Sequence, residues 1–306
     1  MKRITPILSG LIMLFSLILT AQQTPHYTQY LYNMQTINPA YVGARADLTI
    51  GLLNRSQWIG VEGAPKTTTF SLNGRIANGL GLGFSVINDK VGLAESTNVN
   101  IDASYTLVVS HYGRLSLGLK GGASFFNNNL SEGVTPDNEI YASLDGSYFN
   151  VGVGAFYYNE RFFAGISMPY LLKTPEFRLE ETDNSTGLSE NINTFLAAGM
   201  LFEINDKIKF KPSTLIKYAP NLPLSIDFNA NILYNEKIEF GLSYRYNDSA
   251  SAMFAVVLNK KLRIGYAYDY TLTDLGTNLS SHEVILLLDL DFKGKGHWLD
   301  NMSCYF

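Results

Sequence analysis

The sequence predicts an all-β chain that closes into a transmembrane antiparallel β-barrel of about fourteen strands in a bacterial outer membrane. Three observations favour this fold: an N-terminal export segment, long stretches of alternating apolar and polar residues, and links that alternate between short and long. Most alternating stretches run to about 10–12 residues, and tilted strands that cross a bilayer need about 9–11. Strands of soluble proteins average about 5–6 residues, so strand length favours a membrane barrel over a β-sandwich.

The composition excludes several other classes of protein. Charged residues make up 16% of the chain and aromatic residues 13%, with an ordinary hydrophobic content of 46%. Few charges exclude intrinsic disorder, and the residue usage excludes a coiled coil. The net charge of −4 without a basic patch predicts no nucleic-acid partner. The single cysteine, Cys304, excludes an internal disulfide framework and a cysteine-based zinc finger.

Residues 1–21 predict a secretory signal peptide. Lys2 and Arg3 precede an apolar run from Ile7 to Leu19, and Ala21 stands at a plausible cleavage point. The run is short for a membrane-spanning helix, which is the alternative, and no later apolar run approaches the ~20 residues that a spanning helix needs. After export, a membrane-embedded chain of this kind can satisfy its backbone groups only as a closed barrel.

Residues 22–43 differ from the rest of the chain. They are rich in aromatic residues, show no clean alternation, and are interrupted by Pro25 and Pro39. We expect an N-terminal segment that either extends into the periplasm or folds into the lumen. A short disordered leader is the alternative, and the density of Tyr, Met and Ile argues against it.

The barrel is expected over residues 44–293, followed by a C-terminal tail over 294–306. Residues 224–234 illustrate the pattern, because Phe228 and Ile232 alternate with Asp227, Asn229 and Asn231. The predicted strands cover residues 44–54, 66–77, 79–89, 96–110, 113–125, 146–158, 161–170, 192–203, 207–218, 224–234, 237–247, 250–259, 261–270 and 281–293.

The links between these stretches follow the pattern of outer-membrane barrels, which have short turns on one rim and longer loops on the other. Short turns are predicted at 77–78, 111–112, 159–160, 205–206, 235–236 and 259–260. Longer links are predicted at 55–65, 90–95, 126–145, 171–191, 219–223 and 271–280, and 248–249 is an exception.

The two faces of the predicted strands differ in chemistry. One face carries Leu, Ile, Val, Phe and Tyr, with tyrosines near strand ends as in an aromatic girdle, and should face lipid. The other face carries charges of both signs, which we interpret as filling and hydrating the lumen; a selectivity filter is the alternative. These inward charges are Arg75, Asp102, Lys120, Asp227, Glu239, Arg245, Arg263, Asp269 and Glu283.

No motif predicts catalysis, a metal site or a cofactor site. None of the four histidines has metal-ligand spacing, and no G-x-S-x-G elbow, P-loop or dinucleotide-binding glycine motif is present. A serine nucleophile inside the barrel is an alternative in principle, because catalytic triads are spatial. We therefore predict that the protein is not an enzyme.

Several blocks in order along the chain resemble the PorP/SprF family, outer-membrane proteins of the type IX secretion system of Bacteroidetes. The blocks are Tyr27-Thr28-Gln29-Tyr30, Asn38-Pro39-Ala40 with Gly43, Arg55-Ser56-Gln57-Trp58-Ile59-Gly60, Gly63-Ala64-Pro65 with Thr67 and Ser71, Asn88-Asp89 with Gly92, Gly165-Ile166-Ser167-Met168-Pro169, Pro212-Ser213 with Lys217-Tyr218, and Ile264-Gly265-Tyr266-Ala267-Tyr268-Asp269 with Ser281-His282-Glu283.

The resemblance implies a non-enzymatic outer-membrane barrel that works with the secretion machinery. Its implied partners are membrane lipid, other type IX components and a secreted cargo such as a large adhesin used in gliding or adhesion. The alternative function is an outer-membrane porin or a transporter of small molecules or lipids. The family blocks supply the candidate partner-binding residues, which are Tyr30, Asn38, Pro39, Ala40, Arg55, Trp58 and Gly60.

Overall fold

The computed structural model describes residues 27–129, 144–172, 176–177, 182–183, 189, 192–220, 222–259, 261–273, 279–290 and 292. The predicted signal peptide at 1–21 and the predicted tail at 294–306 lie outside the described residues. Among the described residues, no helix is both long enough and apolar enough to cross a membrane.

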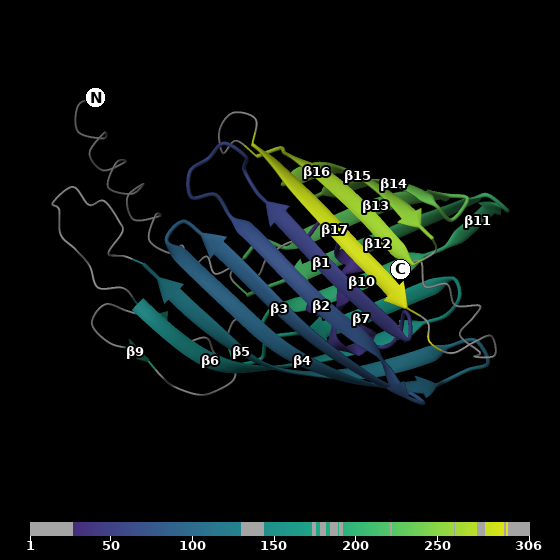
Figure 1. The fold of residues 1–306 in the computed structure, drawn as a ribbon, viewed down its shortest axis with the longest axis horizontal. Helices are drawn as coiled ribbons and strands as arrows, with labels where there is room; N and C mark the ends of the chain where they lie inside the picture. The colour runs from purple at the N-terminus through teal and green to yellow at the C-terminus, as the bar shows by residue number, and fades with distance from the viewer. Residues whose placement is uncertain are drawn as a thin grey trace, which may run out of the picture.

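The protein is a closed antiparallel β-barrel of fourteen strands, shown as a ribbon in Figure 1. Each strand pairs with its neighbour along the chain, and β1 pairs with β17 to close the wall. The strands are β1 Leu48–Ser56, β2 Lys66–Ala77, β3 Leu80–Val91, β4 Ala94–Val108, β5 Arg114–Asn128, β6 Leu144–Tyr158, β7 Phe162–Met168, β10 Thr194–Met200 with its continuation β11 Phe202–Asn205, β12 Ile208–Tyr218, β13 Ser225–Tyr234, β14 Ile238–Arg245, β15 Ser249–Leu258, β16 Leu262–Thr271 and β17 Ser280–Leu290. A separate two-stranded ladder joins β8 Glu176–Phe177 to β9 Thr182–Asp183.

Fourteen alternating stretches were expected, and each corresponds to one strand of the barrel. Three details differ. The link expected at 90–95 is a tight turn at Gly92–Leu93, because Gly92 adopts a positive φ of 60° that reverses the chain within two residues. The strand expected at 192–203 is interrupted at Leu201. The first strand begins at Leu48 because the residues before it lie inside the barrel.

The two faces of the wall have the expected chemistry. On β13, Phe228 and Ile232 are exposed on the outside while Asp227, Asn229 and Asn231 are buried on the inside. On β16, the tyrosines at 266, 268 and 270 face outward and Arg263 and Asp269 face inward. The outer face is therefore an apolar surface suited to lipid, with aromatic residues near the strand ends.

Strand length varies around the wall. Strands β4, β5 and β6 have 15 residues each, whereas β7 and β10 have 7. The turns after β2, β4, β6, β11, β13 and β15 are short and share one rim, which we call the short-turn rim. The opposite rim carries the links at 57–65, 129–143, 169–193 and 272–279, and we call it the long-loop rim.

Residues 27–46, which we call the plug, fill the lumen and appear as the purple turns inside the barrel in Figure 1. The plug contains three single 3₁₀ turns, η1 Tyr30–Tyr32, η2 Met34–Thr36 and η3 Pro39–Tyr41. Every residue from 27 to 44 is buried. The apolar core of the protein is therefore the contact between the plug and inward-facing apolar side chains, among them Leu53, Phe156, Phe163 and Ile285.

Candidate functional site

Three buried clusters of charged side chains on the inner wall bind the plug. The first is a cluster of two acids and one base, which we call the acidic anchor. Arg55 of β1 lies 2.5 Å from the Oδ2 atom of Asp269 and 3.1 Å from the Oε2 atom of Glu283. All three side chains are buried. One base for two acids leaves a formal charge of −1, and a buried charge needs hydrogen-bond donors around it.

The plug supplies those donors. The backbone N–H groups of Thr28 and Gln29 donate to the two carboxylate oxygens of Glu283, at 3.0 and 2.8 Å. The Thr28 hydroxyl donates to Asp269, 2.7 Å from its Oδ2 atom. The acidic anchor is therefore completed only when the plug is seated, because the wall alone leaves the excess negative charge without these donors.

The second cluster, which we call the basic anchor, has the opposite composition. Glu239 of β14 pairs with Lys211 of β12, at 3.0 Å, and with Arg263 of β16. Two bases for one acid leave a formal charge of +1. The Tyr32 ring of the plug lies over both bases, 4.7 Å from the Arg263 guanidinium carbon and 5.4 Å from the Lys211 Nζ atom. The negative face of an aromatic ring attracts cations in this way.

The third place involves the opposite wall. Asp102 of β4 and Lys120 of β5 form a buried ion pair at 2.8 Å. The Gln35 side chain of the plug donates to Asp102 at 3.1 Å and accepts from Asn73 of β2 at 3.0 Å. The plug is thus bonded to walls on both sides of the lumen, which fixes its position across the barrel.

Glycines on three adjacent strands form a seat for Asn38-Pro39-Ala40. The Asn38 side chain accepts from the Ala40 N–H at 2.9 Å, which caps the turn η3, and donates to the Ala155 carbonyl of β6 at 3.1 Å. A Cβ atom at Gly118 of β5 would collide with the backbone of Pro39 and Ala40. Gly154 of β6 and Gly165 of β7 approach the Asn38 amide in the same way. The wall therefore packs closely against this tripeptide, because the three glycines have no side chains.

The plug is joined to β17 by an ion pair, at the seam where β1 and β17 close the barrel. Arg45 lies 2.9 Å from the Oδ2 atom of Asp289 on β17. At the other side of the plug, the Tyr30 hydroxyl accepts from Asn229 at 3.0 Å. Burial raises the pKa of Tyr30 well above its ordinary value, because the charged phenolate would lose its hydration.

A sequence model described as "Type IX secretion system membrane protein PorP/SprF" matches residues 19–288. The chain belongs to the PorP/SprF family. No curated protein matches the chain. The barrel fold and the family together place this PorP/SprF protein in the bacterial outer membrane.

Solved structures with a similar fold include a channel, a transporter and an outer-membrane protein, all of low sequence identity. The CymD monoaromatic hydrocarbon channel is 12% identical with a TM-score of 0.48, and covers 87% of this chain and 93% of its own. The Pseudomonas putida toluene transporter TodX is 7% identical with a TM-score of 0.45, covering 86% and 93%. Omp33 of Acinetobacter baumannii is 8% identical with a TM-score of 0.46, covering 81% and 100%. These values say nothing about what a PorP/SprF barrel binds.

The structure divides the candidate partner-binding residues between the lumen and the long-loop rim. Five of them are buried between plug and wall, and these are Tyr30, Asn38, Pro39, Ala40 and Arg55. Trp58 and Gly60 lie in the link 57–65. The Trp58 N–H donates to the Ser281 hydroxyl at 3.3 Å, and Gly60 is exposed with a φ of 94°. A direct contact with a partner is therefore available to the rim residues and not to the five that hold the plug.

Several plug-binding residues were missed in the sequence. Lys211 faces inward but lies on a strand whose inner face also carries Leu215, so the alternation there is mixed. The inward apolar residues Leu53, Ile285 and Leu287 were the available signal. Apolar side chains are unfavourable in a water-filled lumen, so their position predicts a protein segment packed against the inner wall.

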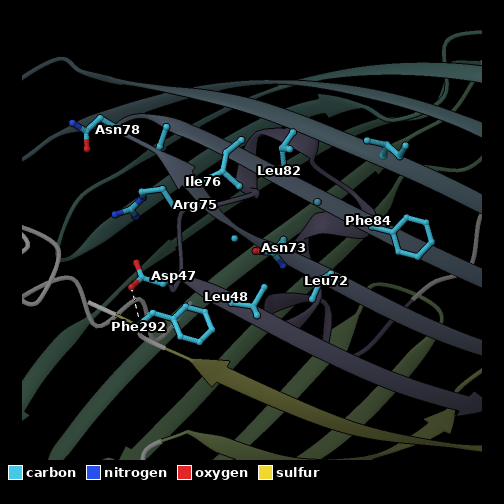
Figure 2. A pocket seen from close by; sticks show the side chains of 14 residues that line it. Asp47, Leu48, Leu72, Asn73, Arg75, Ile76, Asn78, Leu82, Phe84 and Phe292 are labelled. Carbon is cyan, nitrogen blue, oxygen red and sulfur yellow. Dashed lines mark hydrogen bonds between the residues drawn. The ribbon is translucent and has the colours of Figure 1, made fainter. Parts of the chain in front are cut away.

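A separate depression lies on the lipid-facing side, near the short-turn rim, and is shown in Figure 2. Its volume is about 470 Å³, and its apolar lining includes Leu72, Leu82 and Phe84, which belong to the outward set. The Phe292 N–H donates to Asp47 at 3.0 Å at one end. The lining combines these outward apolar side chains with Asp47 and Arg75.

Proposed function

We propose that this barrel is a non-enzymatic partner in type IX secretion that receives or anchors a secreted cargo at the cell surface. The cargo class is a large adhesin of the kind used in gliding or adhesion by Bacteroidetes, and residues 1–21 export the chain as a signal peptide. The family supports the role in secretion. The choice between a channel and a docking partner depends on the lumen.

The filled lumen is the observation that favours a docking partner. The charged side chains of the inner wall are already bonded to the plug or to one another at the acidic anchor, the basic anchor and the Asp102–Lys120 pair. A polypeptide cargo needs a wide water-filled passage, and here the apolar core occupies that space. Cargo contacts are therefore expected on the rims and the outer face.

Pull-down of the tagged protein from detergent-solubilised membranes of the source bacterium tests this proposal. We expect a surface adhesin or a secretion component to be recovered with the barrel. The link 57–65 is the expected contact on the long-loop rim, so Trp58→Ala should reduce recovery several-fold. Tyr112→Ala, on the short-turn rim, is the matched control and should leave recovery unchanged. Recovery of the barrel alone would overturn the proposal.

The alternative is a diffusion porin or a transporter, and planar-bilayer conductance separates it from a docking partner. The plugged barrel should insert and conduct little. A stable pore of nanosiemens scale in the unmodified protein would favour the porin.

A further inference from the structure

Among the described residues, the half of β6 nearer the long-loop rim has a paired strand on one side only. β6 pairs with β5 along its whole length, from Leu144 to Tyr158. On its other side it pairs with β7 only from Val153 to Tyr158. Figure 1 shows the long strands β4, β5 and β6 as the blue and teal part of the wall. The barrel wall beside β6 is therefore shorter along the strand direction, because β7 and β10 have seven residues each.

Three residues explain why the β6–β7 ladder stops at this point. Pro169 follows β7 and has no N–H to continue the pairing. Gly152 of β6 faces it, and a Cβ atom there would collide with the Pro169 carbonyl. The Asn150 side chain then accepts from the N–H groups of Leu171 and Leu172, at 3.0 and 3.3 Å. These three residues therefore end the β6–β7 ladder at this point.

The last backbone hydrogen bond between β6 and the residues after β7 shows which backbone groups of β6 point toward the β7 side. The Leu171 N–H donates to the Val151 carbonyl at 2.9 Å, so Val151 directs its backbone toward the β7 side. In an antiparallel ladder, alternate residues direct their backbone groups to the same neighbour. Asp145, Ser147 and Phe149 therefore present both N–H and C=O at the open edge. Within the described part of the chain, no backbone hydrogen bond from another segment reaches these three residues.

The open edge begins at the boundary of the hydrocarbon core, at Phe149, and continues beyond it to Asp145. A tilted strand crosses the bilayer in about 9–11 residues. Counted from Tyr158 at the short-turn rim, that length ends close to Tyr148. The residues before it lie at the long-loop rim, and Asp145 and Ser147 are exposed in the described part of the chain. An exposed edge with strand geometry is a template for another strand. On the outer face beside it, Phe149 is 78% exposed.

We propose that the edge of β6 from Asp145 to Phe149 binds an extended segment of the secreted cargo as an added β-strand. This inference rests on the proposed function. Main-chain hydrogen bonds to Ser147 and Phe149 supply affinity, and side chains of alternate residues supply specificity. The segment that fits carries an apolar side chain beside Phe149 and Val151 and no proline at the bonding positions. Gly146 on the inner face favours a small side chain opposite it.

Hydrogen–deuterium exchange on the complex recovered by pull-down, and on the isolated barrel, tests the proposal. We expect the peptide covering 145–151 to exchange faster in the isolated barrel and to gain protection in the complex. The peptide covering β13, which is paired on both sides, should behave alike in both samples. A complex that forms while 145–151 keeps its fast exchange would overturn this inference and leave the proposed function intact.

A pair of variants adds a second readout. Ser147→Pro removes one N–H from the open edge and leaves the hydrogen bonds to β5 in place, whereas Ser147→Ala changes only the side chain. We expect Ser147→Pro to reduce cargo recovery at least tenfold and Ser147→Ala to leave it unchanged. Heat-modifiable gel mobility confirms that both barrels are folded. Equal recovery with both variants, or a 145–151 segment already protected in the isolated barrel, would overturn the inference. Failure to recover any cargo would overturn the proposed function itself.

Discussion

The inner wall uses its charged residues to hold the plug rather than to line an open passage. Glu283 connects wall and plug, because it accepts from two plug N–H groups and pairs with Arg55. Its neighbour Asp269 shares the same guanidinium. Buried polar networks are costly when one member is lost, since the remaining groups stay desolvated without a partner.

Glu283→Gln should therefore destabilise the protein. The amide keeps one acceptor for two N–H donors and turns its own NH2 group toward the second donor, and we expect a loss of about 2 kcal/mol in the free energy of unfolding. Urea titration in lipid vesicles measures it. Glu62→Gln, at an exposed loop position, is the control and should change little. Equal effects of the two substitutions would contradict the role given to the acidic anchor.

Gly118→Ala should loosen the seat of the Asn38-Pro39-Ala40 tripeptide. The added methyl group collides with plug backbone, and overpacking of this kind costs about 1–3 kcal/mol. Gly121→Ala on the same strand is a matched control, because a Cβ atom there meets nothing within 4 Å. Comparing protease sensitivity of the plug in the two variants checks the prediction. A seat that accepts both methyl groups alike would show that the close approach is not needed.

The plug is the element that connects most parts of the wall. It contacts β2, β4, β6, β12, β13, β16 and β17 through the hydrogen bonds, the ion pair and the ring contacts described above. Its own secondary structure is three single turns, which are too short to be stable in isolation. Contacts with the wall therefore stabilise the conformation of the plug, and the plug supplies hydrogen-bond donors that the charged groups of the wall need.

Replacing residues 27–43 by a flexible Gly/Ser linker of the same length should open the barrel. The inner face would then be a wet surface carrying both signs of charge, and we expect conductance to rise from near zero to nanosiemens scale in planar bilayers. The unmodified protein in the same membranes is the control, and heat-modifiable mobility shows that the variant is folded. A variant that folds and conducts no better than the parent would mean that something besides the plug closes the lumen.

For the molecule as a whole, the two rims define an orientation. Outer-membrane barrels have short turns in the periplasm and long loops outside. In this barrel, the rim with the links at 57–65 and 129–143 should face the medium. The same orientation places the open edge of β6 on the outside, where a secreted protein can reach it.

Cysteine labelling of intact cells checks that orientation. In a Cys304→Ser background, Glu62→Cys on the long-loop rim should react with a membrane-impermeant maleimide. Glu160→Cys on the short-turn rim should react only after the outer membrane is permeabilised. Both side chains are exposed, so access is set by membrane side and not by burial. The reverse labelling pattern would show that the long-loop rim faces the periplasm, which would contradict the surface proposed for cargo.

Strand number, strand positions and the chemistry of the two faces could be predicted from the sequence, because period-two alternation acts within each strand. Asp227 and Glu239 were identified as inward in this way. The path of residues 27–46 could not be predicted, since it depends on contacts between distant residues, such as Thr28 with Glu283. The shortness of β7, which pairs with β6, was also not predicted. Pro169 ends the backbone pairing, whereas the apolar residues continue beyond it in the sequence. Partner contacts at Trp58 and Gly60 remain a prediction.

The acidic anchor also has a consequence for how the barrel is assembled. Arg55 and Glu283 face each other in the register between the first and last strands, and Arg45 and Asp289 bridge the same seam. The plug, among the first residues made, binds a carboxylate more than 250 positions later in the chain. Contacts of such high sequence separation form late in folding. Seating of the plug and closure of the ring are therefore one event, and a chain that stalls before β17 arrives keeps its N-terminal segment unbound and within reach of chaperones and proteases.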